Sequence, residues 1–412
     1  MTVLRIAHVV RRLVFEEWGG TETVVWNTAC RQLQTGLEPE ILATAALSRP
    51  GTEVCAGIPV HRFRYRYPYF PMTMADAAAL DRKGGNPCSR ELERALLNGR
   101  YDIVHIHCGG HLAAAAGHAA HWLGIPSVLT LHGGAGVIPP EELAEMLRPL
   151  RHKFHYGRLI DLCRRIPRDP LRAADGLICL SRAEKEHLAL KYPGKQIFLL
   201  PNGIDVDHFR QEAPLPLREQ ARFGIPARRR IILCISRIDY QKNQLALLDL
   251  LPQTADTHLL LIGPVTAGWY HNAILERVRK LGLEGRVTIV PGLPPSSPLL
   301  PAALRNAYAF ILPSRHEPFG IAALEAWAAG VPLLAAATGG LRDIVQDGEN
   351  GLLFAHDSPA QLLDAWRRLE SSERLRRHLV ARARETVEQY RWPRIVERLL
   401  DIYRSVSAAA AE

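Results

Sequence analysis

The sequence lacks a long apolar run. Hydrophobic residues make up 47% of its 412 residues, yet no uninterrupted stretch approaches the ~20 residues that a membrane-spanning helix needs. The opening residues, MTVLRIAHVVRR, carry too short an apolar part for a signal peptide and predict a strand instead. These absences argue against an integral membrane protein, and the 23% of charged residues is typical of a soluble globular chain.

Paired cysteine motifs are absent as well. The seven cysteines are odd in number, scattered and never spaced as C-x-x-C, so neither a disulfide framework nor a cysteine zinc site is expected. Scattered thiols suit a reducing compartment, and we expect a cytoplasmic protein. The chain also contains no recognised nucleic-acid-binding motif and no complete G-x-G-x-x-G. The run HGGAG at 132–136 follows a middle strand, so a dehydrogenase is not expected.

Acidic residues do not balance the basic ones, and the net charge is +9. The alternation HRFRYRY at 61–67 would place Arg62, Arg64 and Arg66 on one face of a strand. In a second basic segment, Asp161 and Asp169 are outnumbered by cations. These are Arg148, Arg151, Lys153, Arg158, Arg164, Arg165, Arg168 and Arg172. Such charge is either a solvated surface or a field that attracts an anionic acceptor or an anionic membrane, which would allow peripheral contact at the inner face of a membrane.

Apolar runs alternate with helical patterns from end to end, which predicts an α/β protein with parallel sheets. A Pro-rich stretch follows Pro201–Asp205, and we place a domain junction there. The first domain is therefore expected at 1–205 and the second at 206–390. Two segments of the first domain stand out: Tyr67–Asn86 looks irregular, and Ile138–Pro170 looks mostly helical.

Strands are expected wherever a short apolar run ends at a turn signal. In the first domain these are Val3–Val10, Glu40–Thr44, Val60–Tyr65, Ile103–His107, Ser127–Leu131, Gly176–Leu180 and Ile197–Leu200. In the second domain they are Arg230–Ile235, His258–Ile262, Val287–Val290, Ala309–Leu312, Val331–Ala336 and a short edge strand at Asn350–Phe354.

One stretch organises the second domain: FILPSRHEPFGIAALEAWAAGVPLLAAATGG, residues 310–340. A strand leads into a polar loop, and Pro318 and Gly320 open a helix that ends at Gly330. Open α/β sheets bind ligands at this carboxyl edge, where the first amides of a helix suit a phosphate. Glu317 and Glu325 bracket the turn on different elements, so we expect them to grip two ends of one extended ligand.

Residues 317–325, EPFGIAALE, resemble the donor-binding motif of family 4 glycosyltransferases, which are retaining enzymes with the GT-B fold. The resemblance implies two Rossmann-like parallel-sheet domains that face a central cleft, with a C-terminal helix at 391–412 that crosses back to the first domain. It also implies that Glu325 binds the ribose and Glu317 the donor sugar, with Phe319, Gly320 and Ile321 close to the donor phosphates.

Two further loops match the family. After the second domain's first strand, Arg237 and Lys242 stand where the family holds the donor diphosphate, and both cation types bind phosphate well. In the first domain the resemblance assigns the Gly19–Gly20 pair to the donor phosphate and His132 to the donor sugar. The expected catalytic residues are therefore Arg237, Lys242, Glu317 and His132.

Two patterns could indicate a metal. The first is a cluster of ligand-type side chains at His105, His107, Cys108 and His111, which we interpret as lining of the acceptor side of the cleft. The second is the D-x-D run at 205–207, which lies in the link between the domains. Neither supports a metal strongly, so no metal and no cofactor are expected.

The expected function is transfer of a hexose-type sugar from a nucleotide diphosphate-sugar, with UDP favoured over GDP, to an acceptor hydroxyl with retention. The acceptor could be anionic, a glycan, lipid-linked or a small molecule. Three alternatives stay open: a nucleotide-sugar epimerase of the same fold, an enzyme that uses inorganic phosphate as co-substrate, and a non-catalytic nucleotide-sugar-binding protein. The base, the sugar, the acceptor and the oligomeric state are not fixed by these motifs.

Overall fold

The computed structural model describes the chain except for residues 1–2, 16–18, 83, 134–139, 141–142, 145–146, 168, 211–224, 226–228, 255, 294–296 and 412. Contacts divide it into two compact units. The first unit is Met1–Asn202 together with Trp392–Glu412, and the second is Gly203–Arg391. The Pro-rich stretch expected after the junction lies outside the described residues.

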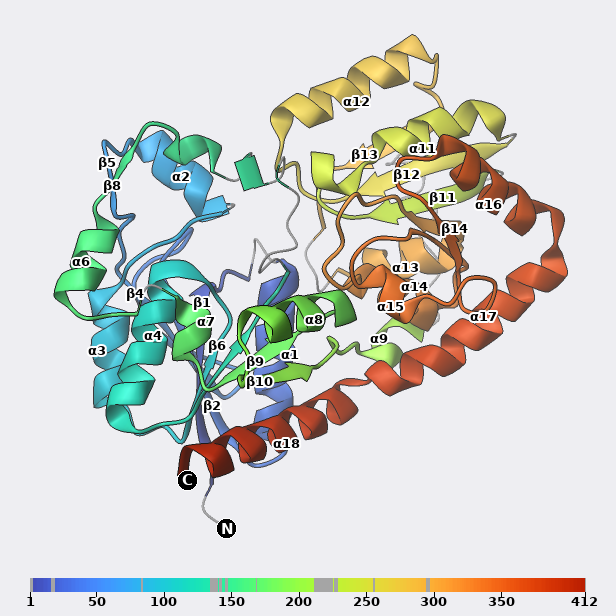
Figure 1. Cartoon of the computed structure of the whole chain (residues 1–412). Helices are drawn as coiled ribbons and strands as arrows, with labels where there is room; N and C mark the ends of the chain where they lie inside the picture. The colour runs from blue at the N-terminus through green and yellow to red at the C-terminus, as the bar shows by residue number, and fades with distance from the viewer. Residues whose placement is uncertain are drawn as a thin grey trace. The chain divides into compact units, whose positions relative to one another are not determined.

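The first unit is built on an eight-stranded sheet with the order β10-β9-β7-β6-β1-β2-β4-β3 (Figure 1). Its strands are β1 (Arg5–Arg12), β2 (Glu38–Thr44), β3 (Gly51–Cys55), β4 (Ile58–Phe63), β6 (Ile103–Ile106), β7 (Ser127–Thr130), β9 (Gly176–Cys179) and β10 (Gln196–Leu199). All neighbours pair in parallel except β3, which pairs antiparallel with β4 at the edge. The sequence did not indicate β3, because none of its residues is buried and an apolar pattern is therefore missing.

Helices of the first unit alternate with these strands, and the last helix of the chain returns to it. They are α1 (Gly20–Gln34), α2 (Met74–Arg82), α3 (Arg90–Asn98), α4 (Gly110–Leu123), α6 (Gly157–Cys163), α7 (Pro170–Ala173), α8 (Arg182–Lys191) and α18 (Trp392–Ala411), with a 3-10 turn η1 (Arg148–Leu150). Helix α18 packs against α1, so the C-terminal helix belongs to the first unit.

The segments Tyr67–Asn86 and Ile138–Pro170 each contribute one short strand to a two-stranded ribbon. Strand β5 (Tyr69–Phe70) pairs antiparallel with β8 (Phe154–His155). Two-residue strands carry no periodic signal, which explains why the sequence did not reveal them. The segment Tyr67–Asn86 also contains helix α2, whose Leu80 packs with Tyr67 and Tyr69 in a local apolar cluster.

The second unit has a six-stranded sheet in which all neighbours are parallel, with the order β13-β12-β11-β14-β15-β16. Its strands are β11 (Arg230–Ile235), β12 (Thr257–Ile262), β13 (Val287–Val290), β14 (Ala307–Leu312), β15 (Leu333–Ala336) and β16 (Leu352–Phe354). Its helices are α9 (Val206–Arg210), α11 (Leu245–Leu250), α12 (Gly268–Lys280), α13 (Leu299–Asn306), α14 (Ile321–Ala329), α15 (Leu341–Ile344), α16 (Pro359–Ser371) and α17 (Glu373–Val387), with 3-10 turns η2 (Tyr240–Lys242), η3 (Leu251–Gln253) and η4 (Glu388–Tyr390).

The expected fold class is confirmed: two Rossmann-like α/β units with parallel sheets. Each sheet reverses its strand order beside its first strand, between β11 and β14 in the second unit and between β1 and β6 in the first. Ligands of open α/β sheets bind at the carboxyl ends of the strands at such a point. Within the described part of the chain, no helix combines the length and the apolar character needed to cross a bilayer.

Candidate active site

In the second unit, two loops meet at the point where the strand order reverses. One loop follows β11 and carries Arg237 and Lys242, and the other follows β14 and carries Glu317. Backbone and side-chain hydrogen bonds join them: Arg315 N donates to Gln241 O at 2.8 Å, and Gln241 Nε2 donates to His316 O at 3.1 Å. The sequence-predicted residues of both loops therefore lie at one edge of the sheet.

Lys242 and Glu317 are paired with each other. Lys242 Nζ lies 2.7 Å from Glu317 Oε2, and both side chains are only 12% exposed. Ser314 Oγ donates to the same carboxylate oxygen at 3.2 Å. A partly buried pair of this kind holds both side chains in place, and each can exchange its partner for a ligand group of the same charge.

Arg237 is held by neutral and acidic neighbours on its own loop. Its Nη2 donates to Gln241 Oε1 at 2.8 Å, and Nη1 lies 3.5 Å from Asp239 Oδ2. Asp239 is buried and accepts a hydrogen bond from Thr266 Oγ1 at 2.8 Å. A guanidinium has five N–H donors, so these contacts orient Arg237 and still leave donors for a diphosphate. Gln241 and Asp239 were not singled out from the sequence, because their role depends on loop geometry.

The loop around Glu317 is pressed against the glycine pair that follows β15. A Cβ on Gly339 would lie 2.1 Å from Glu317 O, and Gly339 adopts φ +49°. Gly340 N donates to Glu317 O at 2.9 Å. Gly320 also needs a left-handed backbone, with φ +98°, and its Cβ would meet Leu341 at 2.6 Å. Glycine is favoured at position 339 by the close approach of the Glu317 backbone and at position 320 by the left-handed backbone conformation.

Helix α14 begins at Ile321 with the amides of its first turn directed at this edge. Its N-cap, Gly320, provides no side-chain hydrogen bond, so a ligand can use the unsatisfied amides and the positive end of the helix dipole. The Phe319 ring is buried, 2% exposed, and meets Tyr390 edge to face. Phe319 can therefore offer a ligand its backbone but not its ring.

Glu325 lies one turn further along α14, whose other side chains from Ala323 to Ala329 are buried. Burial raises the pKa of its carboxyl to about 7. Among the residues that the structure describes, no donor or cation pairs with this carboxylate. A desolvated acceptor without a partner is a good site for a pair of ligand hydroxyls.

His316 was missed from the sequence. It is 8% exposed, stands next to Glu317, and its Nε2 has no hydrogen-bond partner within the described residues. Burial is the main cause that lowers the pKa of its ring, so the ring is neutral at pH 7. A lone histidine in a loop gives no signal by itself. Its proximity to Lys242 and Glu317 is visible only in the fold.

In the first unit, Gly19 and Gly20 begin helix α1 at the carboxyl end of β1. Gly19 is the N-cap in an extended conformation, and its Cβ would lie 2.7 Å from Glu22 Oε2. Glu22 is in turn paired with Arg12 at 2.9 Å. A side chain at position 19 would displace the Glu22 carboxylate from this arrangement, while the backbone angle of Gly19 is one that any residue adopts. Residues 16–18, which precede the pair, lie outside the described residues.

His132 lies just beyond β7 and is the first member of a chain of buried histidines. Its Nε2 is 3.0 Å from His107 Nδ1, and His107 Nε2 is 3.0 Å from His8 Nδ1. His8 Nε2 reaches Gln32 Oε1 at 2.7 Å. His132 and His107 follow the carboxyl ends of β7 and β6, and His8 lies in β1, so these neighbouring parallel strands place the three histidines in a row.

The far end of the chain fixes its direction. Gln32 Nε2 donates to the hydroxyl of Tyr403 on α18, so Gln32 Oε1 accepts from His8. Burial lowers the pKa of His8 and of His132 to about 4, so each neutral ring has a single N–H. Each ring then donates toward Gln32, and His132 is left with Nδ1 as its free acceptor. The polar His8 within the apolar β1 was the sequence signal that could have revealed the chain.

His105 lies beside this row of histidines and has separate hydrogen-bond partners. Its Nδ1 lies 2.6 Å from the Tyr403 hydroxyl, and its Nε2 lies 2.7 Å from Thr130 Oγ1. His105 and His107 do share one face, with ring centroids 3.9 Å apart. Both are buried inside the unit, at 2% and 4% exposed, which corrects their interpretation as lining of the acceptor side.

His8, His105 and His107 form the one group with metal-ligand spacing among the described residues. Each of their six ring nitrogens already has a hydrogen-bond partner at 2.6–3.0 Å. The D-x-D run likewise has structural partners: Asp205 Oδ1 accepts from His208 N at 3.1 Å, and Asp207 pairs with Arg391 at 2.8 Å. The polar atoms of both groups thus have partners within the protein.

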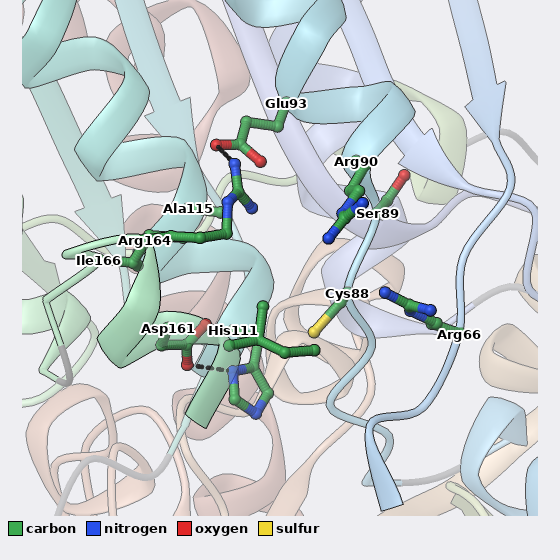
Figure 2. Close-up of a pocket in the computed structure, with 11 residues that line it drawn as sticks. Arg66, Cys88, Ser89, Arg90, Glu93, His111, Ala115, Asp161, Arg164 and Ile166 are labelled. Atoms are coloured by element: carbon green, nitrogen blue, oxygen red, sulfur yellow. Dashed lines mark hydrogen bonds and ion pairs between the residues drawn. The ribbon is translucent and has the colours of Figure 1, made fainter. Parts of the chain in front are cut away.

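A cavity of about 30 Å³ lies elsewhere in the first unit, between α3, α4 and α6. Figure 2 shows Arg66 and Arg90 on one side of it, with Arg164 and the pair Asp161–His111 opposite. Asp161 Oδ2 lies 2.5 Å from His111 Nδ1. His111 Nε2 continues to His155 Nε2 at 2.6 Å, so the fourth member of the expected cluster belongs to this cavity.

The cavity lining is basic. Three guanidinium groups and two carboxylates line it. Arg164 forms an ion pair with Glu93 at 2.5 Å, and Asp161 pairs with His111. Arg66 and Arg90 are exposed and have no carboxylate partner within the described residues. The prediction of three arginines on one strand face was wrong, because β4 ends at Phe63 and Arg66 follows it into the loop. Arg62 instead pairs with Glu53.

Comparisons with known proteins identify the family of the chain. The family model "Glycosyl transferases group 1" matches residues 218–386, and "Glycosyltransferase Family 4" matches residues 18–208. A D-inositol 3-phosphate glycosyltransferase of Kineococcus radiotolerans is 30% identical over 436 residues, which cover 96% of this chain and 92% of that protein. The similarity therefore spans both units.

Two solved structures share the fold. A sucrose-phosphate synthase from Thermosynechococcus elongatus superposes with a TM-score of 0.72 at 21% identity, covering 98% of this chain and 100% of that one. The Anabaena protein HepE, solved with UDP and glucose, gives 0.73 at 18% identity with the same coverage. The fold is that of a GT-B glycosyltransferase. The chain belongs to glycosyltransferase family 4, and the expected enzyme class is confirmed.

Proposed function

We propose that the protein transfers a hexose-type sugar from a UDP-sugar to a hydroxyl of an acceptor that carries a phosphate group, with retention at the anomeric carbon. The observation that carries the donor half is Glu325, a desolvated carboxylate without a described partner on α14. Ribose offers two adjacent hydroxyl donors, and accepting them would satisfy the carboxylate. HepE, solved with UDP and glucose, supports uridine as the base.

The leaving group in this proposal is the nucleoside diphosphate. Arg237, Lys242 and the amides at Gly320 and Ile321 supply positive charge that favours the departing phosphate, an effect that is worth several kcal/mol when preorganised. The Lys242–Glu317 pair would open on donor binding, so that lysine meets phosphate and glutamate meets sugar hydroxyls. Because two protein cations already serve the diphosphate, we propose that no divalent metal and no cofactor are needed.

We assign His132, Gly19 and Gly20 in the first unit the roles that the family resemblance predicts, at the donor sugar and donor phosphate. At a pKa of about 4 the His132 ring stays neutral at pH 7, so it can only exchange hydrogen bonds with sugar hydroxyls. Retention follows if the acceptor hydroxyl attacks the face that the diphosphate leaves, with a phosphate oxygen accepting its proton.

The acceptor half rests on the basic cavity of the first unit. Arg66 and Arg90, which have no described carboxylate partner, could hold a phosphate over the Asp161–His111 pair. The space holds about two waters, so a phosphate would sit at its mouth. Similar proteins are named for phosphorylated polyhydroxy compounds, namely D-inositol 3-phosphate and sucrose phosphate.

A thermal-shift panel of UDP-, GDP- and ADP-sugars tests the donor. A UDP-sugar at a hundredfold its Kd should stabilise the protein by roughly 2.7 kcal/mol, and the other bases should stabilise it less. Turnover with sugar phosphates, followed by NMR of the anomeric proton, tests acceptor and stereochemistry. Conversion of free donor without an acceptor would favour an epimerase. Activity that is lost with a chelator and restored only by a divalent ion would overturn the metal-independent mechanism.

A further inference from the structure

Large apolar side chains are exposed together on the ribbon β5–β8 and the elements beside it. Phe70 and Phe154 are directly opposed in the antiparallel pair and are 69% and 62% exposed. Met74, at the start of α2, is 91% exposed, and Leu159 and Leu162 on α6 are more than half exposed. These five residues are called the ribbon patch.

The local fold turns these side chains outward. Tyr69 and His155 take the inner face of the ribbon, where their rings stack at 4.4 Å and His155 reaches His111. Successive strand residues face opposite ways, so Phe70 and Phe154 must point out. Gly157 N donates to Pro68 O, which ties α6 to the start of β5.

Helix α6 is two-sided. Ile160 and Asp161 face the basic cavity, whereas Leu159 and Leu162 face solvent at helical spacing. Nothing in the described part of the first unit covers them. The exposure is thus built into the positions of the ribbon and the helix and does not come from one misplaced side chain.

Positive charge surrounds the ribbon patch. Between residues 147 and 165 the acidic residue is Asp161, which is buried against His111. The cations of the same segment are Arg148, Arg151, Lys153, Arg158, Arg164 and Arg165. Lys153 reaches Asp76, and Arg148, Arg151, Arg158 and Arg165 are exposed.

We propose that the ribbon patch binds the surface of an anionic lipid bilayer. Protruding aromatic and aliphatic side chains enter the boundary between headgroups and acyl chains, and surrounding arginines attract acidic headgroups. Both features occur here on the same elements. A protein partner would instead have to present acidic side chains around an apolar centre.

This inference is independent of the donor and acceptor chemistry. Helix α6 would then have two roles, because its inner face lines the cavity proposed for the acceptor phosphate and its outer face would contact the bilayer. A helix with side chains is about 10 Å across. A bilayer against the outer face would therefore lie within roughly that distance of the cavity.

Vesicle flotation of the full chain tests the proposal, with phosphatidylcholine vesicles that either contain phosphatidylglycerol or lack it. We expect the wild type to float with the anionic vesicles only, and binding to weaken in high salt. The variant Phe70→Ser/Phe154→Ser should bind at least about tenfold more weakly, since both anchors become polar. Leu190→Ser is the matched control, because Leu190 is 86% exposed on α8, away from the ribbon, and it should bind like wild type.

Circular dichroism and turnover with a water-soluble acceptor check that the variants are folded. Arg151→Gln/Arg158→Gln should lose preference for anionic vesicles and keep turnover. Equal flotation of the ribbon variant and the wild type would overturn the proposal, as would no flotation of the wild type. Sedimentation that shows a wild-type dimer dispersed by Phe70→Ser/Phe154→Ser would overturn it in favour of contact between two copies.

Discussion

The buried carboxylate of Glu325 destabilises the unliganded protein when it is charged. For the same reason it is suited to binding a ligand that donates hydrogen bonds. The unfolded carboxyl has a pKa of 4.5, and burial raises it to about 7 in the folded protein. The folded state therefore binds more protons between these values, and its stability falls as the pH rises from 4.5 to about 7. Above that range the protein carries a desolvated charge that only a ligand relieves.

Glu325→Gln should separate these effects. Without the charge, the variant should be more stable than wild type at pH 8, by at most about 3 kcal/mol, and the difference should vanish toward pH 4.5. Donor KM should rise, because a charged hydrogen bond worth about 1.5–3 kcal/mol is lost. Melting curves at both pH values and steady-state kinetics measure the two effects. An unchanged donor KM would remove Glu325 from the donor site.

Arg237 should act on turnover more than on binding. In the proposed mechanism its guanidinium would face charge that grows as the glycosidic bond breaks, so Arg237→Ala should lower kcat by roughly a hundredfold or more. Arg237→Lys should recover only part, because the planar fork that also contacts Gln241 is lost. Kinetics with saturating acceptor decide the point. Full kcat in Arg237→Ala would show that the arginine has no role in the chemical step.

The chain of histidines predicts the tautomer of the His132 ring, which can be measured without substrate. If each ring donates toward Gln32, His132 carries its proton on Nε2. Nitrogen-15 NMR of the ring should show that tautomer in the wild type and a mixture in His107→Leu. His107→Asn, whose side-chain oxygen can replace Nδ1 as acceptor, should keep it. Retention of the single tautomer in His107→Leu would contradict the assigned direction.

At the scale of elements, the loop that carries Glu317 depends on the glycine pair after β15. Gly339→Ala would force a methyl group into Glu317 O and should abolish the donor-induced thermal shift. Gly348 is the matched control, because it has φ +77° and open space around it. Both variants bear the same left-handed strain of about 1–2 kcal/mol, so only Gly339→Ala should lose the response to donor. Equal responses would show that the close approach is unimportant.

Elements with a strong local pattern were predictable from the sequence. The strands of the second sheet and the loop around Glu317 follow from apolar runs and from proline and glycine placement. Strand β3 was not predictable, because its residues are exposed, and β5 and β8 are too short for periodicity. The histidine chain was missed for a different reason. It needs β1, β6 and α18 side by side, and α18 lies at the other end of the chain.

At the scale of the whole molecule, the two units divide the polar chemistry between them. The second unit holds the cations, the glutamates and the helix start that suit a nucleotide diphosphate. The first unit holds a basic cavity lined by Arg66 and Arg90 and the buried chain that ends at His132. The proposed diphosphate ligands Arg237 and Lys242 and the proposed acceptor-phosphate ligands Arg66 and Arg90 thus lie in different units, so these two groups of ligands can be tested separately.

Hydrogen exchange with single ligands tests this division. UDP alone should slow exchange most strongly in residues 236–242 and 317–325 of the second unit, because the proposed diphosphate site lies between these two segments. A sugar phosphate should act most strongly on residues 88–93 and 157–166, which line the basic cavity. Arg90→Ala should abolish the second response and leave the first intact. If UDP instead protected the cavity segments, or if the sugar phosphate protected the loops around Arg237 and Glu317, the two binding sites would have to be exchanged.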